Sequence, residues 1–277
     1  MELTMVRHRS ERGFLAGFAI GSLGGMIGLG GAEFRLPLLV RVFRLRSLEA
    51  VILNKATSLI VVSTALLTRS INIPVHSLWS HIDVAFNLLA GSLIGAWWAA
   101  GHAMTMPLQR LDDLILLVLL CLGILMLGEA LYGIVPSAKP LVANSLVRIA
   151  FGIAAGLLIG MVAATLGVAG GELLIPTIVL LYGVDIKLAG SLSLVVSLPT
   201  MLVGFLRYRS SEAFAVLHQE SALFKALTAG SILGAIAGGL MLGLLPSNLL
   251  TAGLGLLLLF SAWKTFRHTH SAENQAC

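Results

Sequence analysis

A glycine-rich segment followed by a carboxylate occurs twice in this chain. Residues 28–37 read GLGGAEFRLP and residues 167–176 read GVAGGELLIP, so that Glu33 and Glu172 each follow a pair of glycines. Adjacent glycines interrupt a helix, and the helix that starts after the interruption directs unpaired N–H groups and the positive end of its dipole toward it. Such a helix end favours an anion. The two segments therefore predict a site for a small anion, which the glycine backbone can approach closely.

The glutamates and the glycines each have a second interpretation. A carboxylate deep in a membrane is expensive and indicates function, so Glu33 and Glu172 could carry protons coupled to anion movement. They could also cap the two short helices by accepting hydrogen bonds from first-turn N–H groups, and both roles can hold. Glycines spaced four apart favour close helix packing instead, as in Gly17–Gly21–Gly25 and Gly152–Gly156–Gly160.

Further polar residues follow each segment. Arg35 has no counterpart, since the equivalent position is Leu174; it either adds charge to the anion site or pairs with a glutamate. Asn54 and Lys55 lie in the next helix, and Lys55 could instead extend to the membrane interface. The hydroxyls there could bind an anion or bond to backbone. The candidate substrate-binding residues are Gly28, Gly30, Gly31, Glu33, Arg35, Asn54, Lys55, Thr57, Ser58, Gly167, Gly170, Gly171, Glu172, Ser191 and Ser193.

The two segments belong to an internal duplication. At an offset of 139 positions, Gly17, Gly21, Gly28, Gly31, Glu33 and Pro37 fall on Gly156, Gly160, Gly167, Gly170, Glu172 and Pro176. Self-similarity at one fixed offset predicts two copies of one structural unit.

Composition places these copies in a membrane. Of the 277 residues, 57% are apolar and only 11% are charged, whereas a soluble domain carries about 25% charged residues. The net charge of +5 is a matter of topology under the positive-inside bias, and we do not expect nucleic-acid binding. The histidines lie only in tails or connections, and no HExxH, GxSxG or P-loop motif occurs. We predict no enzyme, no cofactor and no metal site.

The first apolar segment is too long for one crossing. Residues 13–44 would form a helix of roughly 48 Å, against a hydrocarbon core of about 30 Å. The segment either crosses as a broken helix or turns at the glycines and returns to the same face as a re-entrant pair. The following loop carries Arg41, Arg44 and Arg46, and the positive-inside bias places it beside the basic N-terminus, which favours re-entrance.

The remaining segments define two membrane repeats. We expect spanning helices at 47–68, 79–101 and 110–132, with Arg69 in a polar connection, and then at 187–207, 218–243 and 247–266. The repeats are 1–132 and 147–266, with a linker at 133–146, a second broken segment at 147–183 and a polar tail at 267–277. Three crossings per half give an all-α integral membrane protein with an inverted repeat; spanning broken segments give eight parallel-repeat helices instead. Both arrangements place the N- and C-termini on the same side, the cytoplasm.

At these motifs the chain resembles the sulfite exporter TauE/SafE family of bacterial membrane permeases. The resemblance rests on two copies of G-x-G-G-x-E with a following proline, each before a polar stretch, here ATSL and GSLSL. It departs at Ala169, where the first copy has Gly30, and no cysteine lies near either motif. The resemblance implies transport of small sulfur-containing anions such as sulfite, sulfonates or thiosulfate.

From the residues and the resemblance together we predict a secondary transporter of a small sulfur anion in the bacterial inner membrane. It would work by alternating access around the facing glycine breaks, with protons as a possible coupling partner. Two alternatives stay open. A passive anion channel would give flux without saturation, and a membrane assembly or scaffold factor would give a partner on co-purification and no flux.

Overall fold

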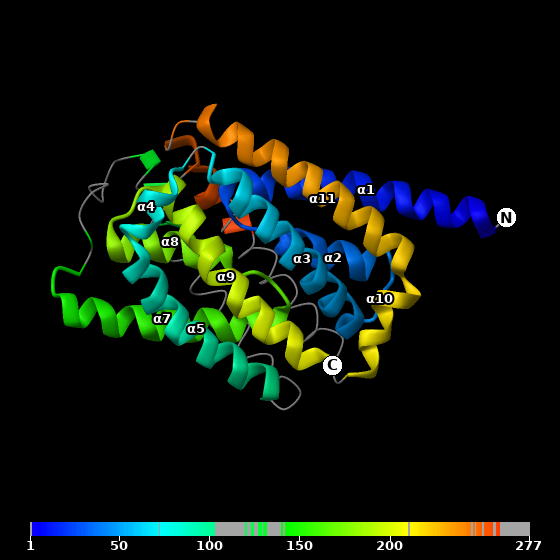
Figure 1. Ribbon diagram of the computed structural model, residues 1–277, viewed down its shortest axis with the longest axis horizontal. Coiled ribbons are helices and arrows are strands. Elements are labelled where there is room, and N and C mark those ends of the chain that lie inside the picture. Colours follow the sequence, from blue (N-terminus) through cyan, green and yellow to red (C-terminus); the bar gives the residue numbers. More distant parts are fainter. Residues whose placement is uncertain are drawn as a thin grey trace, which may run out of the picture.

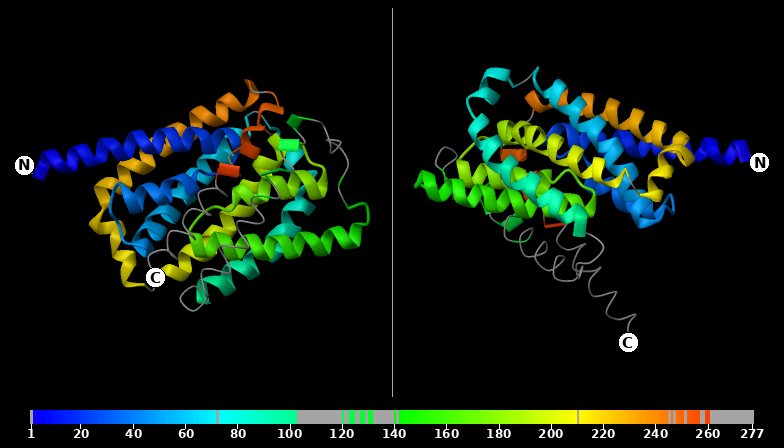
Figure 2. Two further views of the ribbon diagram at one scale, coloured as in Figure 1. Left: turned by 180° about the vertical axis from the view of Figure 1, so that it is seen from behind. Right: turned by 60° about the horizontal axis from the view of Figure 1, so that its bottom comes forward.

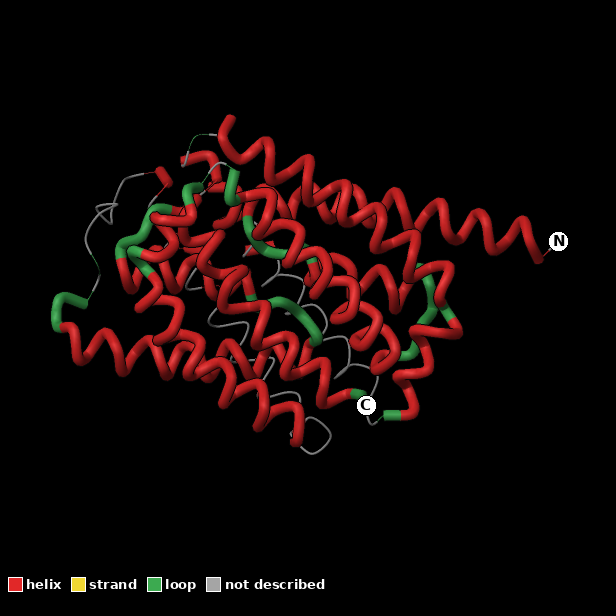
Figure 3. The backbone as a smooth tube through the Cα atoms, in the orientation of Figure 1, coloured by secondary structure: helices red, strands yellow, loops and turns green. Residues whose placement is uncertain are grey.

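The structure, a computed structural model, describes residues 2–71, 73–102, 142–209 and 211–244, with short pieces between 120 and 140 and between 246 and 260. All regular elements within these residues are helices joined by short loops (Figures 1 and 3). The first half contains α1 (Glu2–Ile27), α2 (Ala32–Arg41), α3 (Ser47–Arg69), α4 (Val75–Trp79) and α5 (Ile82–His102). The second half contains α7 (Ser145–Leu166), α8 (Gly171–Tyr182), α9 (Ile186–Tyr208), η1 (Glu212–Ala215), α10 (Val216–Gln219), α11 (Ser221–Met241) and η2 (Leu242–Leu244).

Within the described residues, five helices are long and apolar enough to cross a membrane: Leu48–Arg69, Ile82–Ala99, Ser145–Ala164, Ile186–Tyr208 and Ser221–Met241. The predicted helices 47–68, 79–101, 187–207 and 218–243 are confirmed, with ends that differ by at most three residues. The largest differences arise because α4 and α10 are separate short helices before α5 and α11. The tail 267–277 and most of the linker 133–146 lie outside the described residues, and the predicted helices 110–132 and 247–266 are described only in pieces.

The predicted interruption of each first segment is confirmed. α1 ends at Ile27 and α2 begins at Ala32, and between them Gly28, Gly30 and Gly31 have φ angles of 94°, 76° and 70°. In the second half Gly167 and Gly170 have φ angles of 68° and 74° between α7 and α8. Residues other than glycine rarely adopt these left-handed backbone angles. The glycines therefore end one helix and let the next start in a new direction. We call the residues 28–31 and 167–170 the first and second break.

After each break the chain turns back along the helix it has left. A methyl group on Gly31 would lie 2.8 Å from the carbonyl oxygen of Ile20, so the start of α2 contacts α1 well before its end. At the other end, the Arg9 guanidinium donates to the carbonyl oxygen of Phe43, just beyond α2, at 2.8 Å. α2 therefore runs antiparallel to α1. The same turn occurs in the second half, where Gly170 packs against Ile159.

The first helix of each half packs against the other half. In Figures 1 and 2, α1 lies along α11 and α7 lies along α5. The contacts are backbone to backbone, because the glycines of α1 (Gly17, Gly21, Gly25) face Leu227, Ser231 and Ala235 of α11. The packing role predicted for the four-spaced glycines is correct at these positions.

These contacts recur at the offset of the duplication. Gly156 and Gly160 of α7 face Leu88 and Ser92 of α5, each 139 positions from its counterpart in the α1–α11 pair. Likewise Gly28 packs on Gly190, and Gly167 packs on Val51. Each of these glycine contacts made by the first half on the second is thus returned by the second on the first. Such reciprocal contacts are the property of an isologous, two-fold arrangement of the halves.

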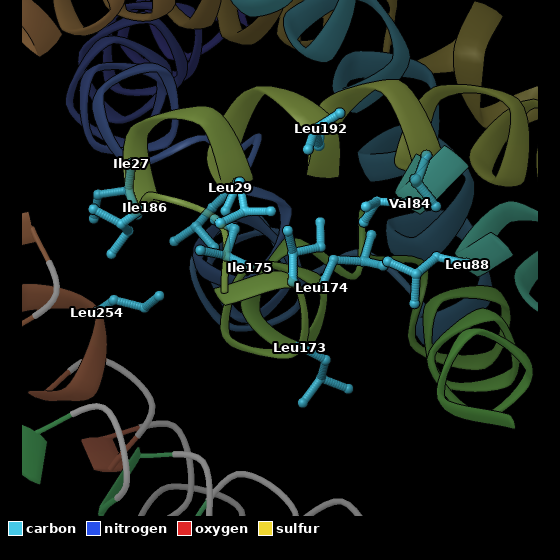
Figure 4. Packing of buried hydrophobic residues seen from close by; sticks show 14 of the residues in the cluster. Ile27, Leu29, Val84, Leu88, Leu173, Leu174, Ile175, Ile186, Leu192 and Leu254 are labelled. Atoms are coloured by element: carbon cyan, nitrogen blue, oxygen red, sulfur yellow. The ribbon is translucent and has the colours of Figure 1, made fainter. Parts of the chain in front are cut away.

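The largest buried apolar cluster surrounds the start of α8. Leu174 and Ile175 pack there with Leu29 from the first break and with Ile186 and Leu192 of α9 (Figure 4). Leu29 is fully buried although it lies in a non-helical segment. The cluster fixes the first break against the second half.

Candidate functional site

The two breaks are in contact with each other. A methyl group on Gly171 would lie 2.9 Å from Cα of Leu29, and one on Gly30 would lie 3.5 Å from Cβ of Ala169. Both Leu29 and Ala169 are buried. The structure therefore brings together the two glycine segments that the sequence singled out, although they lie 139 positions apart.

Both short helices start at this meeting point. The residue before the first turn is Gly31 for α2 and Gly170 for α8, so neither N-cap has a side chain to bond the first-turn N–H groups. Glu172 lies in the first turn of α8 and is 8% exposed. Glu33 lies in the first turn of α2, and its side chain is outside the described part. Two positive helix ends are thus directed at one buried region.

Side chains of α3 and α9 hold the carbonyl groups of the breaks. Asn54 Nδ2 donates to the carbonyl oxygen of Gly167 at 3.1 Å and to that of Ala32 at 2.9 Å. Ser193 Oγ donates to the carbonyl oxygen of Gly28 at 3.0 Å. Asn54 and Ser193 are equivalent under the duplication, and so are Gly167 and Gly28. The two halves therefore make the same interaction with different side chains, each reaching across to the break of the other half.

Arg35 bonds to the break of its own half. Its guanidinium donates to the carbonyl oxygen of Gly30 at 2.5 Å and to Ser58 Oγ at 2.9 Å. In the second half Ser197 Oγ donates to the carbonyl oxygen of Ala169, the counterpart of Gly30, at 2.7 Å. Arg35 thus has a backbone-bonding role like that of Ser197. Thr57 contacts Thr228 of α11, with 3.4 Å between the hydroxyl oxygens.

Lys55 is buried between α3 and α9. It is 1% exposed, so its extension to the membrane interface is wrong. Its Nζ lies 5.1 Å from the centroid of the Tyr208 ring, and a methyl group on Gly204 would lie 2.5 Å from Nζ. Tyr208 in turn donates its hydroxyl proton to the carbonyl oxygen of Ala164, in the last turn of α7, at 3.1 Å. The ring that faces the ammonium is therefore bonded to the last turn of α7, shortly before the second break.

Arg69 is a site residue that the sequence reasoning missed. It was predicted in a polar connection, but it ends α3 and is fully buried. Its guanidinium donates to the carbonyl oxygens of Gly25 (3.1 Å) and Met26 (2.9 Å), at the end of α1. It also donates to the carbonyl oxygen of Lys187 at 2.6 Å and to Ser191 Oγ at 3.0 Å. Carbonyl groups at a helix C-terminus attract a cation. The carbonyl groups that Arg69 bonds therefore compensate the cost of burying its guanidinium.

The chain also matches one known protein family. Residues 4–126 and 151–276 match the family described as sulfite exporter TauE/SafE. The chain belongs to the TauE/SafE family. No curated protein and no solved structure matches the chain.

Membership of the TauE/SafE family makes this chain a multi-pass membrane protein of a family of sulfur-anion transporters, and it agrees with the prediction that the chain is no enzyme. The two matched stretches lie in the two halves of the duplication. In this TauE/SafE protein, the internal duplication relates Arg69 to Tyr208, and it relates Gly25 to Ala164. Arg69 and Tyr208 each bond the last turn of the helix before a break. The duplication was therefore the sequence signal that could have placed Arg69 in the site.

Proposed function

We propose that this protein is a secondary transporter of a small sulfur-containing anion, such as sulfite, a sulfonate or thiosulfate, in the bacterial inner membrane. The observation that carries the proposal is the meeting of the two breaks, where α2 and α8 both begin at a glycine. An anion there would accept hydrogen bonds from backbone N–H groups of two positive helix ends. Three buried cations, Arg35, Lys55 and Arg69, surround these breaks and favour negative charge there.

The candidate residues take different roles in this transporter. The glycines of the breaks and Lys55 would bind the anion directly, whereas Asn54, Ser193 and Arg35 would keep the break backbone in a binding geometry through the carbonyl bonds described above. Ser58 and Ser191 would support the arginines that bond to them. Glu33 and Glu172 would either exchange protons coupled to anion movement or order the two helix starts.

We also infer that each broken segment is re-entrant and that the repeats are inverted. The antiparallel course of α1 and α2, with Arg9 bonded to the carbonyl oxygen of Phe43, supports a return to the starting face. Each half then has three full crossings, an odd number, which inverts the second copy. The loop with Arg41, Arg44 and Arg46 lies in the cytoplasm with both termini, in accord with the positive-inside bias.

Cysteine labelling separates the two topologies. In a background with Cys121 and Cys277 replaced by serine, Val42→Cys and Ile71→Cys place single thiols at exposed positions, after α2 and after α3. In intact cells, a membrane-impermeant maleimide should label Ile71→Cys and spare Val42→Cys until the membrane is opened. The reverse pattern would establish eight spanning helices, because each broken segment would then cross the membrane.

Anion flux tests the transport proposal. In proteoliposomes loaded with sulfite or a sulfonate, we expect the Arg35→Ala, Lys55→Ala double variant to lower the initial flux at least about tenfold, the effect of losing roughly 1.4 kcal/mol of binding. Lys225→Ala is the matched control, because Lys225 is exposed on α11. Size-exclusion chromatography of both variants keeps misfolding apart from loss of binding.

Three results would contradict the proposal. Unchanged saturable flux in a well-folded double variant would remove the proposed site. Flux that does not saturate would identify a passive channel. The complete absence of flux for every anion, together with a partner that co-purifies, would identify a scaffold factor.

A further inference from the structure

The ammonium of Lys55 differs from the other buried cations. Arg35 and Arg69 each donate to backbone carbonyl oxygens and to a serine hydroxyl. Lys55 faces the ring of Tyr208 across 5.1 Å, and among the described residues neither a carboxylate nor a carbonyl oxygen bonds to it. A buried ammonium without such a partner is unfavourable. Among the described residues the position opposite this ammonium is therefore open to a negative charge supplied by a bound anion.

Two residues of the second half lie beside this ammonium. Gly204 leaves the space for Nζ, since a methyl group there would lie 2.5 Å from it. Tyr208 presents its ring to the cation, an attraction that holds a desolvated ammonium in place, and its hydroxyl bond to Ala164 fixes the ring. Gly204 and Tyr208 lie four positions apart on α9, which puts them on the same face of that helix.

The duplication does not repeat this arrangement. The counterparts of Lys55, Gly204 and Tyr208 are Leu194, Ala65 and Arg69, and Arg69 bonds to carbonyl groups instead. One chain therefore has this group of residues once, with one positive charge.

We propose that Lys55, Gly204 and Tyr208 form a single-cation subsite that takes a monoanion, so that the transporter prefers a sulfonate or hydrogen sulfite to a dianion such as sulfate or thiosulfate. The inference rests on the proposed transport function and adds to it the charge of the substrate. A monoanion neutralises the ammonium, whereas a dianion brings a second negative charge that no further cation of this subsite neutralises. Tyr208 and Gly204 are positioning residues, which act on the anion through Lys55.

Two anions of the same shape test the charge preference. Methanesulfonate carries one charge, and methylphosphonate at a pH above its second ionisation carries two. Both are titrated into the detergent-purified protein, and affinity is read from the ligand-dependent melting temperature. We expect methanesulfonate to bind at least about tenfold more tightly, which corresponds to about 1.4 kcal/mol. Lys55→Met should remove this preference together with methanesulfonate binding.

A glycine pair tests the position of the subsite. Gly204→Ala should displace Nζ and weaken methanesulfonate binding about tenfold, whereas Gly253→Ala should leave it unchanged, because no heavy atom of the described chain lies within 4 Å of a methyl group there. If Gly204→Ala does not fold, Tyr208→Phe and Tyr208→Leu replace it: the first keeps a ring beside Lys55 and should retain binding, and the second should lose it.

The outcomes separate this inference from the proposed function. Equal binding of both anions with saturable sulfite flux would overturn the monoanion preference and leave the transporter standing. A monoanion preference that survives both Lys55→Met and Gly204→Ala would place the charge selection elsewhere. Neither binding nor flux for any anion would overturn the transporter, and the subsite with it.

Discussion

Replacing Gly160 with alanine is expected to lower the melting temperature of the protein markedly. A methyl group at this position would overlap the carbonyl oxygen of Ser92 and lie 2.7 Å from Cα of Ser92. Both atoms belong to the backbone of α5, so no side-chain rotation can relieve the overlap. The two helices would have to separate along the whole stripe formed by Gly91, Gly95, Gly156 and Gly160.

The expected destabilisation is about 3 kcal/mol, the upper end of what overpacking usually costs. This corresponds to a fall of roughly 6–12 °C in the apparent melting temperature. The measurement is the melting temperature and the yield of monodisperse protein in detergent. Gly253→Ala adds the same methyl group where the described chain leaves open space. Equal melting temperatures for the two variants would show that α5 and α7 do not approach each other as closely as described.

Removing the guanidinium of Arg69 should destabilise the protein even more. Arg69→Met keeps a side chain of similar reach but leaves four acceptors without their donor: the carbonyl oxygens of Gly25, Met26 and Lys187 and the hydroxyl of Ser191. At about 1 kcal/mol for each buried acceptor, the loss is about 4 kcal/mol. The end of α1 would also lose the cation that its dipole attracts.

The melting temperature of the detergent-purified variant tests this expectation. We expect a fall of at least about 8 °C. Arg12→Met is the matched control, because Arg12 is an exposed arginine of α1. Arg69→Lys should recover only part of the stability, since one ammonium cannot reach all four acceptors. A fall no larger than that of Arg12→Met would mean that these bonds contribute nothing net to stability.

The duplication made the breaks predictable from sequence. Gly28 and Gly167 were recognisable as helix interruptions because each heads a cluster of glycines inside an apolar segment too long for one crossing. The burial of Glu172 followed from its place directly after the second cluster. Both are local properties, which depend on backbone conformation and on the length of the apolar stretch.

The partners of these elements could not be predicted in the same way. Arg69 resembles a connection residue because it follows a long apolar run, and only the carbonyl groups at the end of α1 make its burial favourable. For Lys55, the sequence does not reveal that Gly204 leaves space for its ammonium or that the ring of Tyr208 lies beside it. The sequence also does not show which helix will pack against the glycine-rich face of α1 or α7. These are tertiary contacts between segments far apart in the chain.

The exchange of helices between the halves has a consequence for how the protein is made. Gly156 of α7 meets Leu88 of α5, which the ribosome has synthesised earlier. Gly17 of α1, by contrast, meets Leu227, which is synthesised 210 residues later. At about 5–20 residues per second, roughly 10–40 s pass before that partner exists. During this interval the glycine face of α1 has only lipid and the rest of the first half beside it. The helix that enters the membrane first is therefore the one that gains its packing partner last.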